Sequence, residues 1–219
     1  MKVTKFGHCC LLIEENELKI LTDPGIYSTS QDEVKNIDVI LITHEHTDHI
    51  HIPSLKNCIK NNPKARIITN KGVAKMLDLE GIKYEIVEHK ENININGVLI
   101  EGFGERHAEV YDKVAPPVIN TGYFISSKLF YPGDALTDPN KPVEILALPV
   151  AGPWIKLSEA IDYAIKIKPK KCFPVHDGIL KSPGTTNTVP PKALSPFGIK
   201  FLVLEEGKEE LCCMIRQEP

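Results

Sequence analysis

The chain has 219 residues and a net charge of −3, with 42% hydrophobic and 25% charged residues. These proportions are those of a folded globular protein and exclude a disordered, collagen-like or coiled-coil chain. The slightly acidic balance also disfavours a protein dedicated to nucleic acid, because phosphates are bound by a basic surface.

Membrane attachment and export are both disfavoured by the distribution of apolar residues. The longest weakly polar run, residues 145–155, contains two prolines and a glycine and is too short to span a bilayer. The brief apolar stretch near the N-terminus is followed at once by Glu14 and Glu15 and by no signal-peptidase site. We therefore expect a cytoplasmic protein with no membrane partner. The six cysteines include no C-x-x-C pair, which favours reduced, buried thiols over disulfides or a thiolate zinc site.

The first hundred residues predict short strands separated by turns and two helices. Residues 38–43 (DVILIT) form a continuous apolar run, as expected of a strand that is covered on both faces. A helix over 53–60 has Pro53 in its first turn, and a second helix over 71–79 is ended by Gly81. The remaining strands are predicted over residues 9–14, 19–22, 65–69 and 84–87.

The second half of the chain is punctuated in a similar way. Ser158 can cap a helix that continues through Ile167. Residues 182–191 (SPGTTNTVPP) are expected to be irregular and could face a substrate. Strands are predicted over residues 98–100, 123–126, 129–131, 145–150 and 172–175, with a hairpin formed by the second and third of these and a final hairpin by 201–204 and 211–215.

The order of the predicted elements indicates the fold class. Paired strands with scattered helices argue against a doubly wound parallel sheet, and two packed sheets with helices on their outer faces fit better. The sequence contains no repeat, low-complexity tract or linker, so we predict a single domain over residues 1–219.

The motif HEHTDH, residues 44–49, directly follows the predicted strand 38–43. Three imidazoles and two carboxylates in six residues would each need a buried partner in a protein core. They suit a divalent metal, because neutral imidazole and carboxylate are the usual ligands of zinc, manganese and iron. A histidine-rich surface loop is the alternative, which the position directly after a buried strand disfavours.

Three further residues of metal-ligand type follow other predicted strands. His107 comes after the strand that starts at Val98, Asp134 after the strand 129–131, and His176 after the strand 172–175. If these strand ends gather at one edge of the sandwich, their side chains converge on the HEHTDH motif. Either histidine alone would more often be an ordinary core or surface residue, but together the three favour a metal site.

The motif H-x-H-x-D-H, followed by a later His, Asp and His, closely resembles the metallo-β-lactamase superfamily. The likeness extends over almost the whole chain and is strongest to a compact branch of metal-dependent hydrolases that includes L-ascorbate-6-phosphate lactonase. It rests also on residues 7–10 (GHCC), 22–24 (TDP), 131–134 (YPGD) and 173–176 (FPVH). The family fold is a four-layer αββα sandwich, which agrees with the pattern of strands and helices.

The resemblance implies a pair of divalent ions, zinc first, with manganese or iron as alternatives. The implied ligands of the first ion, the first group, are His44, His46 and His107. Those of the second ion, the second group, are Asp48, His49 and His176, and Asp134 is implied to bridge the two ions. Asp48 and Asp134 are also candidate catalytic residues. Asp23 matches an aspartate that orients a ligand histidine in the family. Ala135 departs from the family pattern, because many relatives carry a hydroxyl residue there.

The expected charge of this site favours hydrolysis. Two divalent ions, two aspartates and one bridging hydroxide leave a net charge of roughly +1 in a partly dry cleft. That charge lowers the pKa of bound water toward about 7 and stabilises the oxyanion formed when hydroxide attacks a carbonyl or phosphorus. The predicted function is a dinuclear metal-dependent hydrolase of a small molecule, namely an ester, a lactone or a phosphorylated metabolite.

Two alternative functions stay open. A phosphodiesterase or nuclease of the same superfamily is disfavoured, because the chain has neither a basic balance nor an inserted nucleic-acid domain. A protein that binds metal or ligand without turnover is disfavoured by the complete ligand set. The resemblance also leaves a homo-oligomer open, since relatives in this branch are often multimeric.

Four residues near the predicted site have two interpretations each. His8 could face the site as a proton donor or substrate-orienting group, which makes it a third candidate catalytic residue, or it could be a hydrogen-bonded core histidine. Arg106 and Tyr111 flank His107 and could contact a substrate, but a polar loop accounts for them equally well. Trp154 could line the rim of the site, although core packing is favoured.

Overall fold

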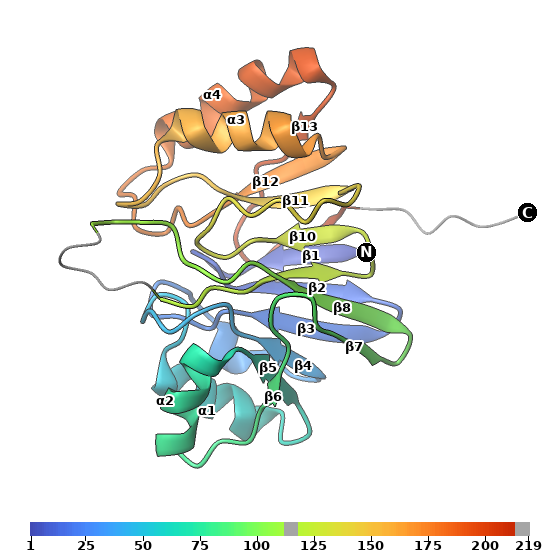
Figure 1. The fold of residues 1–219 in the computed structure, drawn as a ribbon, viewed down its shortest axis with the longest axis vertical. Coiled ribbons are helices and arrows are strands. Elements are labelled where there is room, and N and C mark those ends of the chain that lie inside the picture. Colours follow the sequence, from blue (N-terminus) through green and yellow to red (C-terminus); the bar gives the residue numbers. More distant parts are fainter. Residues whose placement is uncertain (112–117, 213–219) are drawn as a thin grey trace, which may run out of the picture.

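Two seven-stranded β-sheets pack face to face between two pairs of helices (Figure 1). The computed structural model describes residues 1–111 and 118–212. One pair, α1 (Ile52–Asn61) and α2 (Lys71–Leu79), lies at one end of the stack of layers, and the other pair, α3 (Leu157–Ile167) and α4 (Gly184–Leu194), lies at the opposite end. This is the four-layer αββα sandwich that the sequence predicts.

The first sheet has the strand order β14-β1-β2-β3-β4-β5-β6. Its antiparallel part comprises β14 (Glu209–Leu211), β1 (Lys2–Lys5), β2 (Leu11–Glu15) and β3 (Leu18–Thr22). Its parallel part continues from β3 through β4 (Val39–Leu41), β5 (Arg66–Thr69) and β6 (Glu85–Ile86). Parallel neighbours need crossover connections, and η1 (Gln31–Glu33), α1 and α2 lie in the connections β3–β4, β4–β5 and β5–β6 in turn. The carboxyl ends of β1, β3 and β4 therefore lie at one edge of this sheet.

The second sheet has the strand order β13-β12-β11-β10-β9-β8-β7. Its antiparallel part comprises β7 (Asn92–Ile95), β8 (Val98–Phe103), β9 (Gly122–Ile125) and β10 (Leu129–Tyr131). Its parallel part continues from β10 through β11 (Ile145–Pro149), β12 (Lys171–Val175) and β13 (Lys200–Phe201). Because β8 and β10 are both antiparallel to β9, the strands β8, β10, β11 and β12 all end at the same edge.

Three apolar layers hold the sandwich together. The central layer packs β1–β5 side chains such as Val3 and Leu41 against β8–β12 side chains such as Tyr123 and Phe173. One outer layer joins the first sheet to α1 and α2, and the other joins the second sheet to α3 and α4. Alternate residues of a strand point to opposite faces, which is why consecutive residues in these strands are buried in different layers.

Most of the predicted elements are confirmed, including both early helices and the hairpin of β9 and β10. The helix predicted to be capped by Ser158 begins one residue earlier, at Leu157, because the Glu159 side chain accepts a hydrogen bond from the backbone N–H of Lys156 at 2.8 Å. Cys9, Cys10, Cys58 and Cys172 are free and buried, as expected.

The expectation that residues 182–191 are irregular is wrong, because most of them belong to α4. Pro190 and Pro191 remove backbone donors inside this helix, which normally breaks it. The helix persists because Thr186, Pro190 and Leu194, spaced four residues apart, form a buried stripe. Leu194 packs into the outer layer beneath α3, so tertiary burial outweighs the local preference.

The predicted final hairpin is also wrong. Its first strand is β13, which pairs in parallel with β12 in the second sheet, whereas its second strand is β14, which pairs with β1 in the first sheet. The two strands separate because each completes the edge of a different sheet. Residues 213–215 of that predicted hairpin lie outside the described residues. Within the described part of the chain, no helix is long and apolar enough to cross a membrane.

Candidate metal centre

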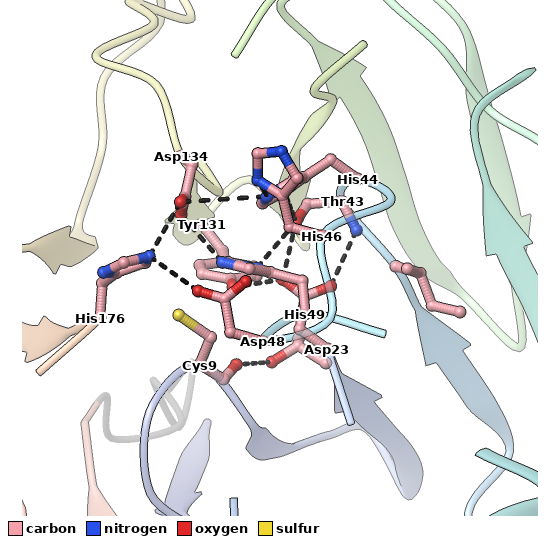
Figure 2. A network of polar contacts seen from close by, with 12 residues as sticks. Cys9, Asp23, Thr43, His44, His46, Asp48, His49, Tyr131, Asp134 and His176 are labelled. Atoms are coloured by element: carbon pink, nitrogen blue, oxygen red, sulfur yellow. Dashed lines mark hydrogen bonds and ion pairs between the residues drawn. The ribbon is translucent and has the colours of Figure 1, made fainter. Parts of the chain in front are cut away.

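All seven predicted metal ligands lie at the sheet edge where β4, β8, β10 and β12 end, and Figure 2 shows six of them labelled in one cluster. The motif of residues 44–49 follows β4 in the first sheet. His107, Asp134 and His176 follow β8, β10 and β12 in the second sheet. The expected convergence of strand ends is therefore what the structure shows, and the cluster joins the two sheets.

The first group of ligand side chains comprises His44, His46 and His107, which offer one nitrogen each within 4.8 Å of one another. Nε2 of His44 and Nδ1 of His46 are 3.1 Å apart. The Nδ1 of His107 lies 2.5 Å from the carbonyl oxygen of Ala108, so that nitrogen donates and Nε2 is left as the free acceptor. The three rings thus present their nitrogens to one common point.

The second group, Asp48, His49 and His176, lies together with His8. These four side chains offer one atom each within 4.8 Å of the others. Oδ2 of Asp48 lies 3.4 Å from Nε2 of His176 and 3.3 Å from Nε2 of His8. His176 has the left-handed backbone angle φ 62 directly after β12, and its N–H donates to the carbonyl of His8 at 2.9 Å. That turn directs the His176 ring back toward the motif.

Asp134 connects the two groups through its two carboxylate oxygens. Oδ1 lies 3.0 Å from Nε2 of His49, which belongs to the second group. Oδ2 lies 3.3 Å from Nε2 of His107 in the first group and 2.8 Å from Nε2 of His176 in the second. The backbone N–H of Asp134 donates to Asn120 at 3.0 Å, which fixes the turn after β10. One carboxylate therefore contacts both groups, as a bridging ligand would.

Buried atoms without hydrogen-bond partners test whether a metal fits here. Nε2 of His49, His107 and His176 and Oδ1 of Asp134 are all buried and have no hydrogen bond. His49 and Asp134 approach to 3.0 Å, yet their orientation is not that of a donor and an acceptor. Orphaned polar atoms of this kind are costly unless something else satisfies them. Imidazole nitrogens and carboxylate oxygens that converge without bonding one another fit divalent metal ions.

A network around Asp23 holds His49 in position. Asp23 lies directly after β3 and is completely buried. Its Oδ2 accepts from Nδ1 of His49 and from the hydroxyl of Thr43, both at 2.7 Å, and from the hydroxyl of Tyr131. The carboxylate therefore keeps the proton of His49 on Nδ1 and leaves Nε2 free for a metal. This agrees with the orienting role that the resemblance implies for Asp23.

Comparisons with known proteins agree with this geometry. Residues 2–176 match the family model of the β-lactamase superfamily domain. The chain belongs to the metallo-β-lactamase superfamily. Protein Rv0786c of Mycobacterium tuberculosis is 33% identical over 82% of this chain and 85% of its own length. A UPF0173 metal-dependent hydrolase of Pyrococcus furiosus is 25% identical over 95% of this chain and 94% of its own.

The fold of this superfamily member is shared with solved structures. A metallo hydrolase from the archaeon Ignicoccus hospitalis superposes with a TM-score of 0.75 at 22% identity, covering 95% of this chain and 97% of its own. The prediction of a metal-dependent hydrolase of the metallo-β-lactamase superfamily is confirmed at that level. The closer likeness to L-ascorbate-6-phosphate lactonase stays a prediction.

His8 is a buried residue that supports Asp48. Its side chain has no exposed surface, and its Nδ1 accepts from the N–H of Gly178 at 3.1 Å. The proton is therefore on Nε2, which faces Oδ2 of Asp48 at 3.3 Å. His8 is therefore a buried, hydrogen-bonded histidine that can position Asp48, and its catalytic role stays a prediction. Arg106 and Tyr111 are exposed on the loop that carries His107.

Two residues that lie at the site were favoured as core residues or were not considered for it. Trp154, on the loop after β11, donates from Nε1 to Oδ2 of Asp134 at 2.9 Å, so its predicted core packing is wrong. Its indole packs edge-on against the rings of His107 and His176. Cys9 is the second such residue, and its thiol lies within 4.8 Å of ligand atoms of His49 and Asp134.

The two groups of this superfamily site differ in protonation when no metal is bound. Burial lowers the pKa of His44 well below its usual value, and burial together with the neighbouring His107 lowers that of His46. Burial also opposes charge on His176, but the nearby Asp134 and Asp48 outweigh it and raise its pKa to about 10. The same balance, with Asp134 as the main opposing group, raises the pKa of His49. His44 and His46 are thus neutral at pH 7, whereas His49 and His176 carry protons.

Metal binding to the second group is therefore expected to release protons. His49 and His176 are protonated at neutral pH in the metal-free protein and must lose those protons to bind a metal ion. The affinity of the second equivalent should rise with pH, by up to about tenfold per pH unit for each proton released, until the pH approaches the raised pKa values. Metal titrations by calorimetry in buffers of different ionisation enthalpy would count these protons. If the affinity for the second equivalent of metal does not change between pH 6 and 8, His49 and His176 are not protonated in the metal-free protein as assigned here.

Trp154 provides a direct report on Asp134, because it donates to that carboxylate and is the only tryptophan of the chain. Metal binding to Asp134 should change its fluorescence. Trp154→Phe keeps an aromatic ring beside His107 and His176 but removes the N–H donor, so we expect metal affinity or turnover to fall about 10- to 100-fold. Unfolding free energy should change by only about 1 kcal/mol. A variant with unchanged metal affinity and turnover would show that the indole only fills space.

Proposed function

We propose that the protein is a dinuclear metal-dependent hydrolase that acts on a small ester, lactone or phosphorylated metabolite. The observation that carries this proposal is the position of Asp134, whose carboxylate contacts both groups of unpartnered histidine nitrogens. Two divalent ions held there would lower the pKa of a water molecule toward neutrality and so supply the nucleophile. Zinc is the first candidate, with manganese and iron as alternatives.

The chain's own residues have separate tasks in this proposal. Asp134 joins the two metal positions and is held by the indole of Trp154. Asp23 and the carbonyl of Ala108 keep His49 and His107 in the tautomer that can bind a metal. Asp48 has 21% of its side chain exposed, which makes it the ligand of the second group most open to an incoming substrate.

Exposed apolar side chains around the site favour a small organic substrate. Ile26 and Tyr27 follow Asp23, Val110 and Tyr111 follow His107, and Ile179 follows His176, and each is at least 42% exposed. Tyr27 lies against the ring of His8 at 5.5 Å. An apolar rim suits an organic group more than the charged backbone of a nucleic acid. This disfavours the alternative of a phosphodiesterase or nuclease of the same superfamily.

The test combines metal analysis with substrate panels. Protein purified without added metal should contain two equivalents of a first-row metal per chain. It should hydrolyse members of an ester or lactone panel, and lose that activity on chelation. Activity on phosphodiesters alone would favour the nuclease alternative. Tight metal binding without turnover on any panel would favour a binding protein. Cytoplasmic location and a homo-oligomer are part of the same proposal, and gel filtration of the purified chain tests the second.

A further inference from the structure

Cys9 is a buried thiol that faces the second group of metal-ligand side chains. It lies in the loop between β1 and β2, is 1% exposed, and belongs to the central apolar layer. Figure 2 shows its sulfur turned toward the cluster. Sγ, a ring nitrogen of His49 and a carboxylate oxygen of Asp134 all lie within 4.8 Å of one another. No other described cysteine belongs to such a group.

The two side chains grouped with this thiol each have a buried atom that is free to bind a metal. Nε2 of His49 and Oδ1 of Asp134 have no hydrogen-bond partner, and both side chains are at least 98% buried. The other ring nitrogen of His49 is bonded to Asp23, so the ring cannot turn away. Three buried side chains therefore bring a nitrogen, an oxygen and a sulfur within 4.8 Å of one another.

We propose that Cys9 is an additional, thiolate ligand of the second metal position. The inference rests on the proposed metal centre and adds to it. When the ion binds, the S–H bond breaks, its proton leaves to solvent, and the sulfur electron pair forms the bond to the metal. The sequence contains no C-x-x-C pair to mark a thiolate site, because the partners of Cys9 come from two distant segments of the chain.

A thiolate changes which metal the second position prefers. Soft sulfur donors favour zinc over manganese, whereas sites built only from nitrogen and oxygen discriminate less. The first group offers three nitrogens and no sulfur. The two positions should therefore differ in metal preference, and the preference of the second for zinc should depend on Cys9.

Cys10 supplies a matched control at the next position. It is equally buried, but it belongs to the outer layer with Cys58 and Leu55, on the opposite side of the sheet from Cys9. Cys9→Ser and Cys10→Ser therefore make the same chemical change at adjacent buried residues, and only the first touches the cluster.

Cobalt substitution of the full chain tests the proposal, because thiolate coordination to Co²⁺ gives an intense charge-transfer absorption in the near ultraviolet. We expect this band in the wild type and in Cys10→Ser, and its loss in Cys9→Ser with cobalt still bound. The Cys9→Ser variant should also lose roughly 10- to 100-fold of its preference for zinc over manganese at one position. Persistence of the band in Cys9→Ser would overturn the proposal.

X-ray absorption of the zinc-loaded wild type needs no variant and decides the question if Cys9→Ser does not fold. The proposal requires a zinc–sulfur distance of about 2.3 Å in the averaged coordination shell. Two bound zinc ions with only nitrogen and oxygen neighbours would overturn the role of Cys9 and leave the proposed hydrolase intact. A chain that binds no metal would instead overturn both.

Discussion

Asp134→Asn is expected to remove the bridge between the two metal positions and abolish hydrolysis. The wild-type carboxylate contacts His49 through one oxygen and His107 and His176 through the other. An amide offers one weaker acceptor and places an NH₂ group against the remaining nitrogens. Loss of roughly 4 kcal/mol of metal-derived stabilisation corresponds to about a 10³-fold fall in turnover. Metal content should fall from two equivalents to one or none.

The same substitution changes protonation in the metal-free protein. Asp134 is the carboxylate that does most to keep His49 charged, and it is one of two that do so for His176. Without it, the pKa of both imidazoles falls, so less charge is buried in the site and the fold should survive. Circular dichroism and thermal melting of the metal-free variant check this. Asp162→Asn makes the same change on the exposed face of α3 and should leave metal content and turnover unchanged. Wild-type turnover in Asp134→Asn would remove the basis for a bridged site.

The convergence of the candidate ligands could be predicted because they follow strands of the two sheets. A strand and the residue after it are read from local sequence, and parallel strands bring their carboxyl ends to one edge. His107, Asp134 and His176 converge on the HEHTDH motif for that reason. The fold class followed from the same local patterns.

Contacts between distant segments could not be predicted in this way. Cys9 meets Asp134, and Trp154 meets the same carboxylate, only after the two sheets have packed. His8 precedes Cys9, but no local pattern in the sequence shows that this thiol faces Asp134 or that Trp154 reaches the same carboxylate. Gly152, two residues before Trp154, is the one hint in the sequence. Its backbone has a φ of +149, and a Cβ at this position would lie only 2.9 Å from Nε1 of Trp154. The helix α4 was missed for a related reason, since burial against α3 overrides its two prolines.

Asp23→Asn is expected to disable the second metal position indirectly, through the contact of residue 23 with His49. Oδ1 of Asp23 accepts from the backbone N–H of Thr43 at 2.8 Å, and Oδ2 accepts from His49, the Thr43 hydroxyl and Tyr131. An asparagine must place its NH₂ group at one of these positions. If the NH₂ group faces Thr43, it meets the backbone N–H of that residue, which is also a donor and cannot become an acceptor. If the NH₂ group faces His49, it forces the imidazole proton onto Nε2, the atom that would bind the metal.

Either orientation of the amide should lower both stability and metal affinity. One buried donor left without an acceptor costs about 1–3 kcal/mol, which urea unfolding of the metal-free protein can measure. Misplacement of the His49 proton should weaken metal binding about 10- to 100-fold, measured by competition with a chelating dye. Tyr131→Phe is the matched comparison, because it removes one hydroxyl from the same carboxylate and leaves the His49 contact in place. It should lower stability by about 1 kcal/mol and leave metal affinity nearly unchanged. Equal losses of metal affinity in the two variants would mean that packing around Asp23 matters and the tautomer of His49 does not.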